Sequence, residues 1–160
     1  MESLGIKKIK KINCNPDGNF NHNPEPLPEN ITDLCSEVKK GKYQLGIVVD
    51  PDADRLVLVD ERGEPFGEEY TLVAAAEYLL SKNHGASTCS NLSSTLALKN
   101  ITEKYGGKYF SSAVGEINVV QVMKEKKCLI GGEGNGGVIY PMTHYGRAVS
   151  YTHLTLPTKV

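Results

Sequence analysis

The sequence lacks the features of several specialised classes of protein. It has no apolar run of about 18 residues and no apolar signal-peptide segment at its N-terminus, so it predicts neither a membrane-spanning helix nor export. Its 18 basic and 19 acidic residues nearly cancel, which leaves no broad electric field to attract nucleic acid or an anionic membrane. We therefore expect a cytoplasmic protein that binds neither nucleic acid nor membranes.

Cysteine is also scarce, and its spacing excludes the common cysteine-based sites. None of the four cysteines forms a C-x-x-C pair, which argues against a zinc site or a redox motif. Each stands among apolar neighbours, so we expect all of them to be small buried hydrophobic residues. They are Cys14, Cys35, Cys89 and Cys128.

The most informative stretch present is an acidic motif, residues 50–55, between two apolar segments. The segment ending at Val49 predicts a buried strand, and a second apolar strand begins at Leu56. Between them lie three aspartates at alternate positions, Asp50, Asp52 and Asp54. Carboxylates this close repel one another unless a cation stands between them, and hard divalent cations prefer oxygen ligands. We therefore predict that the three aspartates bind Mg²⁺.

Arg55 follows the aspartates directly, and the acidic motif has alternative interpretations besides a magnesium site. Arg55 is expected to meet an anionic group of the substrate. An EF-hand loop would match these aspartates and Glu61, but Arg55 stands where that loop needs glycine. A haloacid-dehalogenase-like phosphotransferase would use Asp50 as nucleophile, although Asp54 stands where its motif usually has Thr or Val. A solvated acidic turn without a metal ion is the simplest alternative.

A second motif is the glycine loop, residues 131–137. Its glycines match the dinucleotide-binding pattern G-x-G-x-x-G, but Val138-Ile139-Tyr140-Pro141 follows where a helix should begin. Dense glycine lets the backbone approach a ligand closely, and Glu133 and Asn135 offer hydrogen-bonding groups suited to sugar hydroxyls. The alternative is a plain tight turn between strands.

Two junctions between a strand and a helix add further candidates. Residues 112–116 contain Gly115 and Glu116, where backbone N–H groups could receive an anion or a hydroxyl. Residues 91–95 end a strand and open a helix, so we predict that Ser93 or Ser94 caps that helix.

The order of the expected elements predicts an α/β fold. The first part is expected to contain a strand at 7–14, a loop at 15–28, a helix at 30–41 and the two strands around the acidic motif; Asn30 would cap the helix, and its inward stripe would be Ile31, Leu34, Cys35 and Val38. The second part is expected to contain a helix at 68–82, a strand at 87–91, a helix carrying Leu98, Ile101 and Tyr105, and a strand at 108–111. A helix at 115–126, with Ile117, Val120 and Met123 inward, and a strand at 128–130 would follow. Such alternation predicts mixed, largely parallel sheets flanked by helices, with ligands beyond the carboxyl ends of the strands.

Taken together, the motifs at 50–55, 112–116 and 132–137 resemble those of the α-D-phosphohexomutase family, which includes phosphoglucosamine mutases and phosphomannomutase/phosphoglucomutases. The resemblance covers residues 1–147 and implies a four-domain enzyme. With a boundary in the turn-forming segment 60–65, residues 1–65 would be the later part of domain two and residues 66–147 most of domain three. Residues 148–160 look like a translated sequencing adapter, and we set them aside.

The resemblance also assigns roles to residues. It implies that the three aspartates bind Mg²⁺, that Arg55 lies near the reacting phosphoryl group, and that Gly115 and Glu116 join the substrate site. The family's sugar loop usually reads Gly-Glu-x-Ser-Gly-His, so Glu133 matches, whereas Asn135 stands where Ser is more common.

The activity that the resemblance implies is the interconversion of hexose or hexosamine 1-phosphates and 6-phosphates through a phosphoserine and a bisphosphate. The serine belongs to domain one and the phosphate clamp to domain four, so we expect an internal fragment that is inactive alone. The alternative is a non-catalytic α/β module that binds a metal ion or a sugar phosphate.

Overall fold

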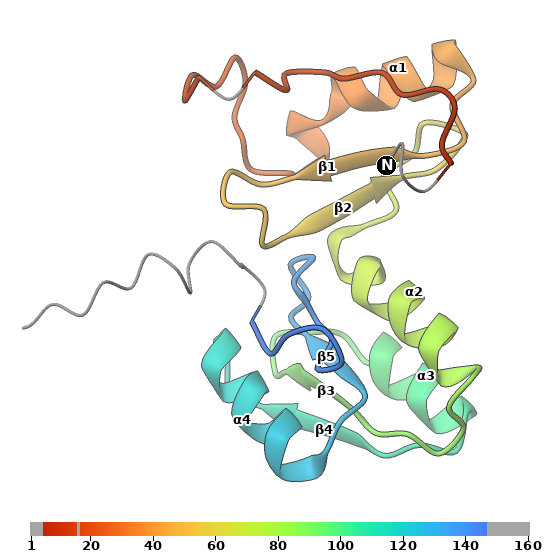
Figure 1. Ribbon diagram of the computed structural model, residues 1–160, viewed down its shortest axis with the longest axis vertical. Helices are drawn as coiled ribbons and strands as arrows, with labels where there is room; N and C mark the ends of the chain where they lie inside the picture. The colour runs from red at the N-terminus through yellow and green to blue at the C-terminus, as the bar shows by residue number, and fades with distance from the viewer. Residues whose placement is uncertain (1–4, 16, 147–160) are drawn as a thin grey trace, which may run out of the picture.

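The computed structural model describes residues 5–15 and 17–146, which form two sheets with their own helices (Figure 1). In the first part, α1 (Thr32–Gly41) covers one face of an antiparallel pair, β1 (Gly46–Val49) and β2 (Leu56–Val59). In the second part, α2 (Glu68–Leu80), α3 (Ala97–Lys104) and α4 (Glu116–Lys126) surround a four-stranded sheet. None of the helices within the described residues has the length and apolar character needed to cross a bilayer.

The first sheet is held to α1 by the apolar stripe expected from the sequence. Ile31 and Val38 are buried against Val57 and Val59, and this confirms the predicted inward face of the helix. Glycine is needed at position 46, because a Cβ there would lie 2.9 Å from a methyl group of Val38. The helix and the strand therefore pack closely at this point.

Several expectations for the first part were wrong. The first strand is buried on only one face, since Ile47 and Val49 are 38% and 50% exposed on the face that α1 does not cover. Residues 7–14 form no strand, because no described strand pairs with them. Cys14 lies in this unpaired segment and is exposed, not buried as expected. Asn30 does not cap α1, because its amide instead donates a 2.9 Å hydrogen bond to the Glu25 carbonyl.

The second sheet confirms the predicted mixed and largely parallel topology. Its order is β4–β3–β5–β6, with strands β4 (Tyr109–Ser112), β3 (Thr88–Asn91), β5 (Ile130–Gly132) and β6 (Val138–Ile139). The central β3 runs parallel to β4 and β5, and only β6 is antiparallel. The carboxyl ends of β3, β4 and β5 therefore share one edge, where their following loops meet.

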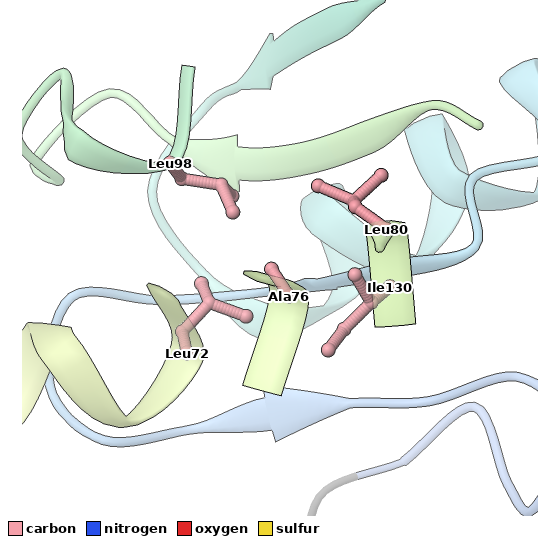
Figure 2. Packing of buried hydrophobic residues seen from close by; sticks show 5 residues of the cluster. All are labelled: Leu72, Ala76, Leu80, Leu98 and Ile130. Atoms are coloured by element: carbon pink, nitrogen blue, oxygen red, sulfur yellow. The ribbon is translucent and has the colours of Figure 1, made fainter. Parts of the chain in front are cut away.

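Helices cover this sheet on both faces. Figure 2 shows one apolar cluster, in which residues of α2 and α3 pack against β5. Its members are Leu72, Ala76, Leu80, Leu98 and Ile130. A second cluster joins Val119 and Met123 of α4 to Cys89 on β3. Burial of each leucine side chain contributes about 1.5–3 kcal/mol to the free energy of folding. The packed helices therefore hold the strand ends in place.

Two local expectations for the second part were also wrong. Ile117 does not face inward but is 79% exposed, because the buried face of α4 is set by Val119 and Met123, one turn apart. Ser93 and Ser94 do not cap α3, because their hydroxyls donate to the Asn91 side-chain oxygen at 3.0 and 2.8 Å.

Candidate functional site

The acidic motif forms the tight turn between β1 and β2. The Ala53 N–H donates to the Asp50 carbonyl at 3.1 Å, and Ala53 itself has a φ of 57°. This turn brings one oxygen from each of Asp50, Asp52 and Asp54 within 4.8 Å of one another. Oxygens bound to a single divalent ion lie up to roughly 4–5 Å apart, so the three residues could hold a metal ion.

Asp50 is the buried member of this group, with 3% of its surface exposed. Its Oδ1 accepts hydrogen bonds from the backbone N–H groups of Asp54 and Arg55 at 3.0 and 3.1 Å, and its Oδ2 accepts one from Arg55 Nε at 2.7 Å. Burial alone would raise the pKa of Asp50, but the hydrogen bonds from Arg55 and Asp54 outweigh it and hold the pKa below its usual value. The carboxylate is therefore charged near neutral pH and suited to a cation.

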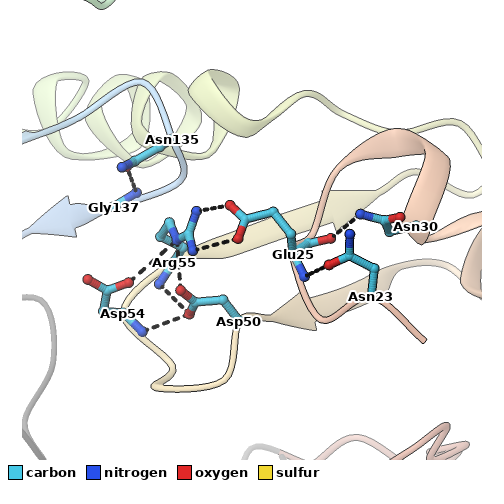
Figure 3. Close-up of polar contacts among 8 residues, drawn as sticks. All are labelled: Asn23, Glu25, Asn30, Asp50, Asp54, Arg55, Asn135 and Gly137. Carbon is cyan, nitrogen blue, oxygen red and sulfur yellow. Dashed lines mark hydrogen bonds and ion pairs between the residues drawn. The ribbon is translucent and has the colours of Figure 1, made fainter. Parts of the chain in front are cut away.

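Arg55 binds a second carboxylate that the sequence interpretation missed. Its Nη1 and Nη2 donate to the two carboxylate oxygens of Glu25, with a distance of 3.2 Å from Nη2 to Oε2 (Figure 3). These bonds to Glu25 first, and those to Asp50 second, raise the pKa of Arg55 above its ordinary value despite partial burial. Within this structure Arg55 therefore binds two carboxylates of the chain itself, and its contact with an anionic group of the substrate stays a prediction.

Glu25 reaches Arg55 from a stiff part of the N-terminal loop. It lies between Pro24 and Pro26, which restrict the backbone, and its N–H donates to Asn23 Oδ1 at 3.1 Å. Its carbonyl accepts the hydrogen bond from Asn30 already described. The only sequence signal for this role was an acidic residue placed between two prolines.

The glycine loop lies directly against the acidic motif. The N–H of Leu56, which follows Arg55, donates to the Gly136 carbonyl at 3.1 Å. Gly136 has a φ of 90°, and a Cβ there would lie 2.8 Å from the Leu56 carbonyl oxygen. Figure 3 shows Asn135 of this loop beside the acidic motif, where its Oδ1 accepts a 3.2 Å hydrogen bond from the Gly137 N–H. The structure therefore brings the two predicted motifs together.

Glu133 joins the glycine loop to the other strand ends. It is 5% exposed, and its Oε1 accepts hydrogen bonds from Asn91 Nδ2 at 2.7 Å and from the Gly115 N–H at 3.1 Å. Gly115, with a φ of 112°, precedes α4, and Glu116 is the first residue of that helix. Three of the predicted substrate-site residues, Glu133, Gly115 and Glu116, are therefore neighbours. Asn91, which the sequence placed at the end of a strand without a role of its own, is joined to them through Glu133.

Local architecture also decides between motif families. Strands β1 and β2 flank the acidic motif, whereas an EF-hand loop lies between helices. The glycine loop leads into β6, whereas the dinucleotide-binding motif opens a helix. Neither alternative matches the structure.

The geometry defines a class of protein, an α/β protein with a candidate cation site in contact with a glycine loop. Residues 1–63 match the family model of the phosphoglucomutase/phosphomannomutase α/β/α domain II, and residues 67–155 match that of domain III. The chain therefore belongs to the phosphoglucomutase/phosphomannomutase family, which confirms the resemblance found in the sequence.

Individual relatives support the same assignment. The chain is 35% identical over 148 residues to a phosphoglucomutase/phosphomannomutase from Thermococcus kodakarensis. The aligned region covers 92% of this chain and 32% of that protein. It is 37% identical over 144 residues to a phosphoglucosamine mutase from Aliarcobacter butzleri, with 88% and 32% covered. A crystal structure of a family protein from Burkholderia thailandensis superposes with a TM-score of 0.72 at 30% identity, covering 83% of this chain and 30% of that one. The chain thus spans about a third of the length of these relatives.

Proposed function

We propose that the chain supplies part of domain two (residues 1–65) and most of domain three (residues 66–147) of a Mg²⁺-dependent phosphohexomutase. The observation that carries the proposal is the contact between the acidic motif and the glycine loop, through the hydrogen bond from Leu56 to Gly136. A cation site and a sugar-hydroxyl site must be adjacent if a phosphoryl group is to pass to a sugar. Residues 148–160, which we propose are not native to the fold, lie outside the described residues.

In this proposal the acidic motif forms the phosphoryl-transfer side of the site. Asp50, Asp52 and Asp54 hold Mg²⁺, which when bound offsets negative charge on the transferring phosphoryl group. Arg55 fixes Asp50 through Nε and its backbone N–H, and its permanent positive charge would face the reacting phosphoryl group.

The glycine loop forms the sugar side. Glu133 accepts hydrogen bonds from sugar hydroxyls, and Asn135 lies in the same loop with a side chain that can both donate and accept. Gly115 and Glu116 complete this side of the site because the Gly115 N–H is bound to Glu133.

The complete enzyme in this proposal interconverts 1-phosphates and 6-phosphates of a hexose or hexosamine. A phosphoserine gives its phosphoryl group to the free sugar hydroxyl, which loses its proton, and the resulting bisphosphate returns its other phosphoryl group to the serine. The serine and the phosphate clamp come from domains one and four, so the chain alone binds Mg²⁺ weakly and has no mutase activity.

A chimeric enzyme tests this function. Residues 1–147 would replace the matching third of the Thermococcus kodakarensis relative, and conversion of glucose 1-phosphate to glucose 6-phosphate would be measured with Mg²⁺. We expect activity in the chimera and a loss of about 100-fold or more with Asp50→Asn, since a charged metal ligand is removed. The matched control is Asp60→Asn, which removes an acidic residue outside the acidic motif.

The outcomes separate the proposal from its alternatives. A folded chimera without activity contradicts the proposed role of the acidic motif. Equal mutase activity in the Asp50→Asn and Asp60→Asn chimeras also contradicts it. Metal binding without activity would favour the non-catalytic module. A dehalogenase-like mechanism would need Asp50 to attack the phosphoryl group and would appear as an acyl phosphate on that residue; its burial and three hydrogen bonds argue against such attack.

A further inference from the structure

We infer that Asn91 is a positioning residue that sets the orientation of the Glu133 carboxylate. The inference rests on the proposed role of Glu133 in binding sugar hydroxyls, and it adds a residue that contacts neither the metal ligands nor the sugar. Asn91 is the last residue of β3 and is 2% exposed, and its amide lies 2.7 Å from Glu133 Oε1.

The orientation of the Asn91 amide follows from its neighbours. An ionised carboxylate only accepts hydrogen bonds, so the Asn91 nitrogen must face Glu133 and its oxygen must face away. That oxygen accepts the hydroxyl protons of Ser93 and Ser94 at 3.0 and 2.8 Å. Both ends of the amide are therefore engaged, and rotation by half a turn would set its oxygen against the carboxylate.

Glu133 accepts one hydrogen bond from the end of β3 and one from the loop that follows β4. Glu133 follows β5, Asn91 ends β3, and Gly115 follows β4, so the shared carboxyl edge of the sheet brings the three together. Ser94 also packs against the glycine loop, since a Cβ at Gly134 would lie 3.3 Å from the hydroxyl oxygen of Ser94. The loop after β3 is thus tied to the glycine loop both by packing and through Asn91.

These contacts matter because Glu133 is long and nearly buried. A buried carboxylate is costly without hydrogen-bond donors, and a glutamate side chain can adopt many rotamers when nothing fixes it. Asn91 supplies a neutral donor, so it fixes the carboxylate without cancelling its charge. We expect loss of Asn91 to disorder the carboxylate and to weaken sugar binding even though the charge remains.

The test uses the whole 160-residue chain and follows the Gly115 amide by NMR. In Asn91→Ala, we expect hydrogen-exchange protection of this amide to fall about tenfold or more, because its acceptor is no longer held in place. Asn100→Ala is the matched control, since it removes an exposed asparagine from α3. In parallel, titration with glucose 1-phosphate should show an affinity about tenfold weaker in Asn91→Ala than in the control.

A reversed pair keeps the test decisive if Asn91→Ala does not fold. Asn91→Asp places a second carboxylate against Glu133 and should unfold more easily, whereas Asn91→Asp/Glu133→Gln restores a carboxylate facing an amide. We expect the double variant to recover the thermal midpoint but not the Gly115 protection, because the amide nitrogen that takes the place of Oε1 cannot accept a hydrogen bond from the Gly115 N–H. The affinity for glucose 1-phosphate should also stay low.

Each result bears on a different claim. Unchanged Gly115 protection in Asn91→Ala, or wild-type stability in Asn91→Asp, overturns the inference. Lost protection with unchanged affinity overturns the step from orientation to binding. Absence of glucose 1-phosphate binding by the unaltered chain counts against the proposed sugar site, while the Gly115 amide still decides the role of Asn91.

Discussion

At the scale of single residues, the acidic motif depends on a chain of charged contacts. Glu25 binds the two Nη groups of Arg55, and Arg55 binds Asp50 through its Nε. Because Arg55 is 22% exposed and Glu25 is 40% exposed, solvent screens their pair more than the contact with buried Asp50. The ionisation of the buried Asp50 carboxylate is therefore linked to folding.

This linkage predicts an acid-sensitive contribution to stability. The folded-state pKa of Asp50 lies below that of the unfolded chain, which is about 3.9. A lowered pKa stabilises the fold at pH above the unfolded value, and this stabilisation is lost as pH falls through the folded pKa. We expect urea unfolding without metal to show a decline in stability below about pH 4 that is smaller in Asp50→Asn.

The matched control is Asp52→Asn, which removes an exposed carboxylate from the same turn. It should retain the decline seen in the unaltered chain. Identical pH profiles for Asp50→Asn and the unaltered chain would show that the hydrogen bonds to Arg55 do not shift this carboxyl group.

At the scale of elements, the two sheets meet where the glycine loop touches the start of β2. The contact includes the bond from Leu56 to Gly136 and a 2.7 Å hydrogen bond from the Thr71 hydroxyl to the Leu56 carbonyl. One residue of β2 is thus bound both by the glycine loop and by α2. This double contact fixes the distance between the candidate cation site and the candidate sugar site.

A pair of glycine substitutions tests the close contact. Gly136 and Gly85 both have positive φ values, 90° and 81°. A Cβ added at Gly136 would meet the Leu56 carbonyl, whereas a Cβ added at Gly85 would meet nothing within 4 Å. We expect Gly85→Ala to cost about 1 kcal/mol from backbone strain, and Gly136→Ala to cost roughly 1–3 kcal/mol more because the loop must move. Urea unfolding gives both values, and hydrogen exchange at Leu56 reports the lost bond. Equal costs for the two variants would contradict the close approach.

At the scale of the whole molecule, the chain holds the two candidate sites but spans about a third of its relatives. The proposed Mg²⁺ site can be tested in the isolated chain. Binding to the folded state alone raises stability in proportion to the logarithm of ligand concentration.

We predict that Mg²⁺ stabilises the isolated chain through the acidic motif. At about ten times its dissociation constant, the ion adds about 1.4 kcal/mol, which raises the thermal midpoint of a chain of this size by roughly 3–6 °C. Asp50→Asn should abolish the shift, and Asp60→Asn should retain it. A shift of the same size in both variants would indicate non-specific binding to acidic surface groups.

The sequence by itself determined many of the local elements and the resemblance to the family. Alternating aspartates between apolar segments predicted the turn of the acidic motif, and apolar spacing predicted the inward face of α1, because both patterns repeat within a few residues. The same reasoning failed for Ile117, because the position of α4 over the sheet, rather than its own periodicity, decides which residues are buried.

Only the tertiary structure decided which polar groups meet. Glu25 and Arg55 are 30 positions apart, and Asn91 and Glu133 are 42 apart. Local sequence cannot predict such pairs, because their contact depends on the path of the whole chain. The folded chain places these partners together where loops converge at strand ends, and there a serine that resembles a helix cap instead binds an asparagine.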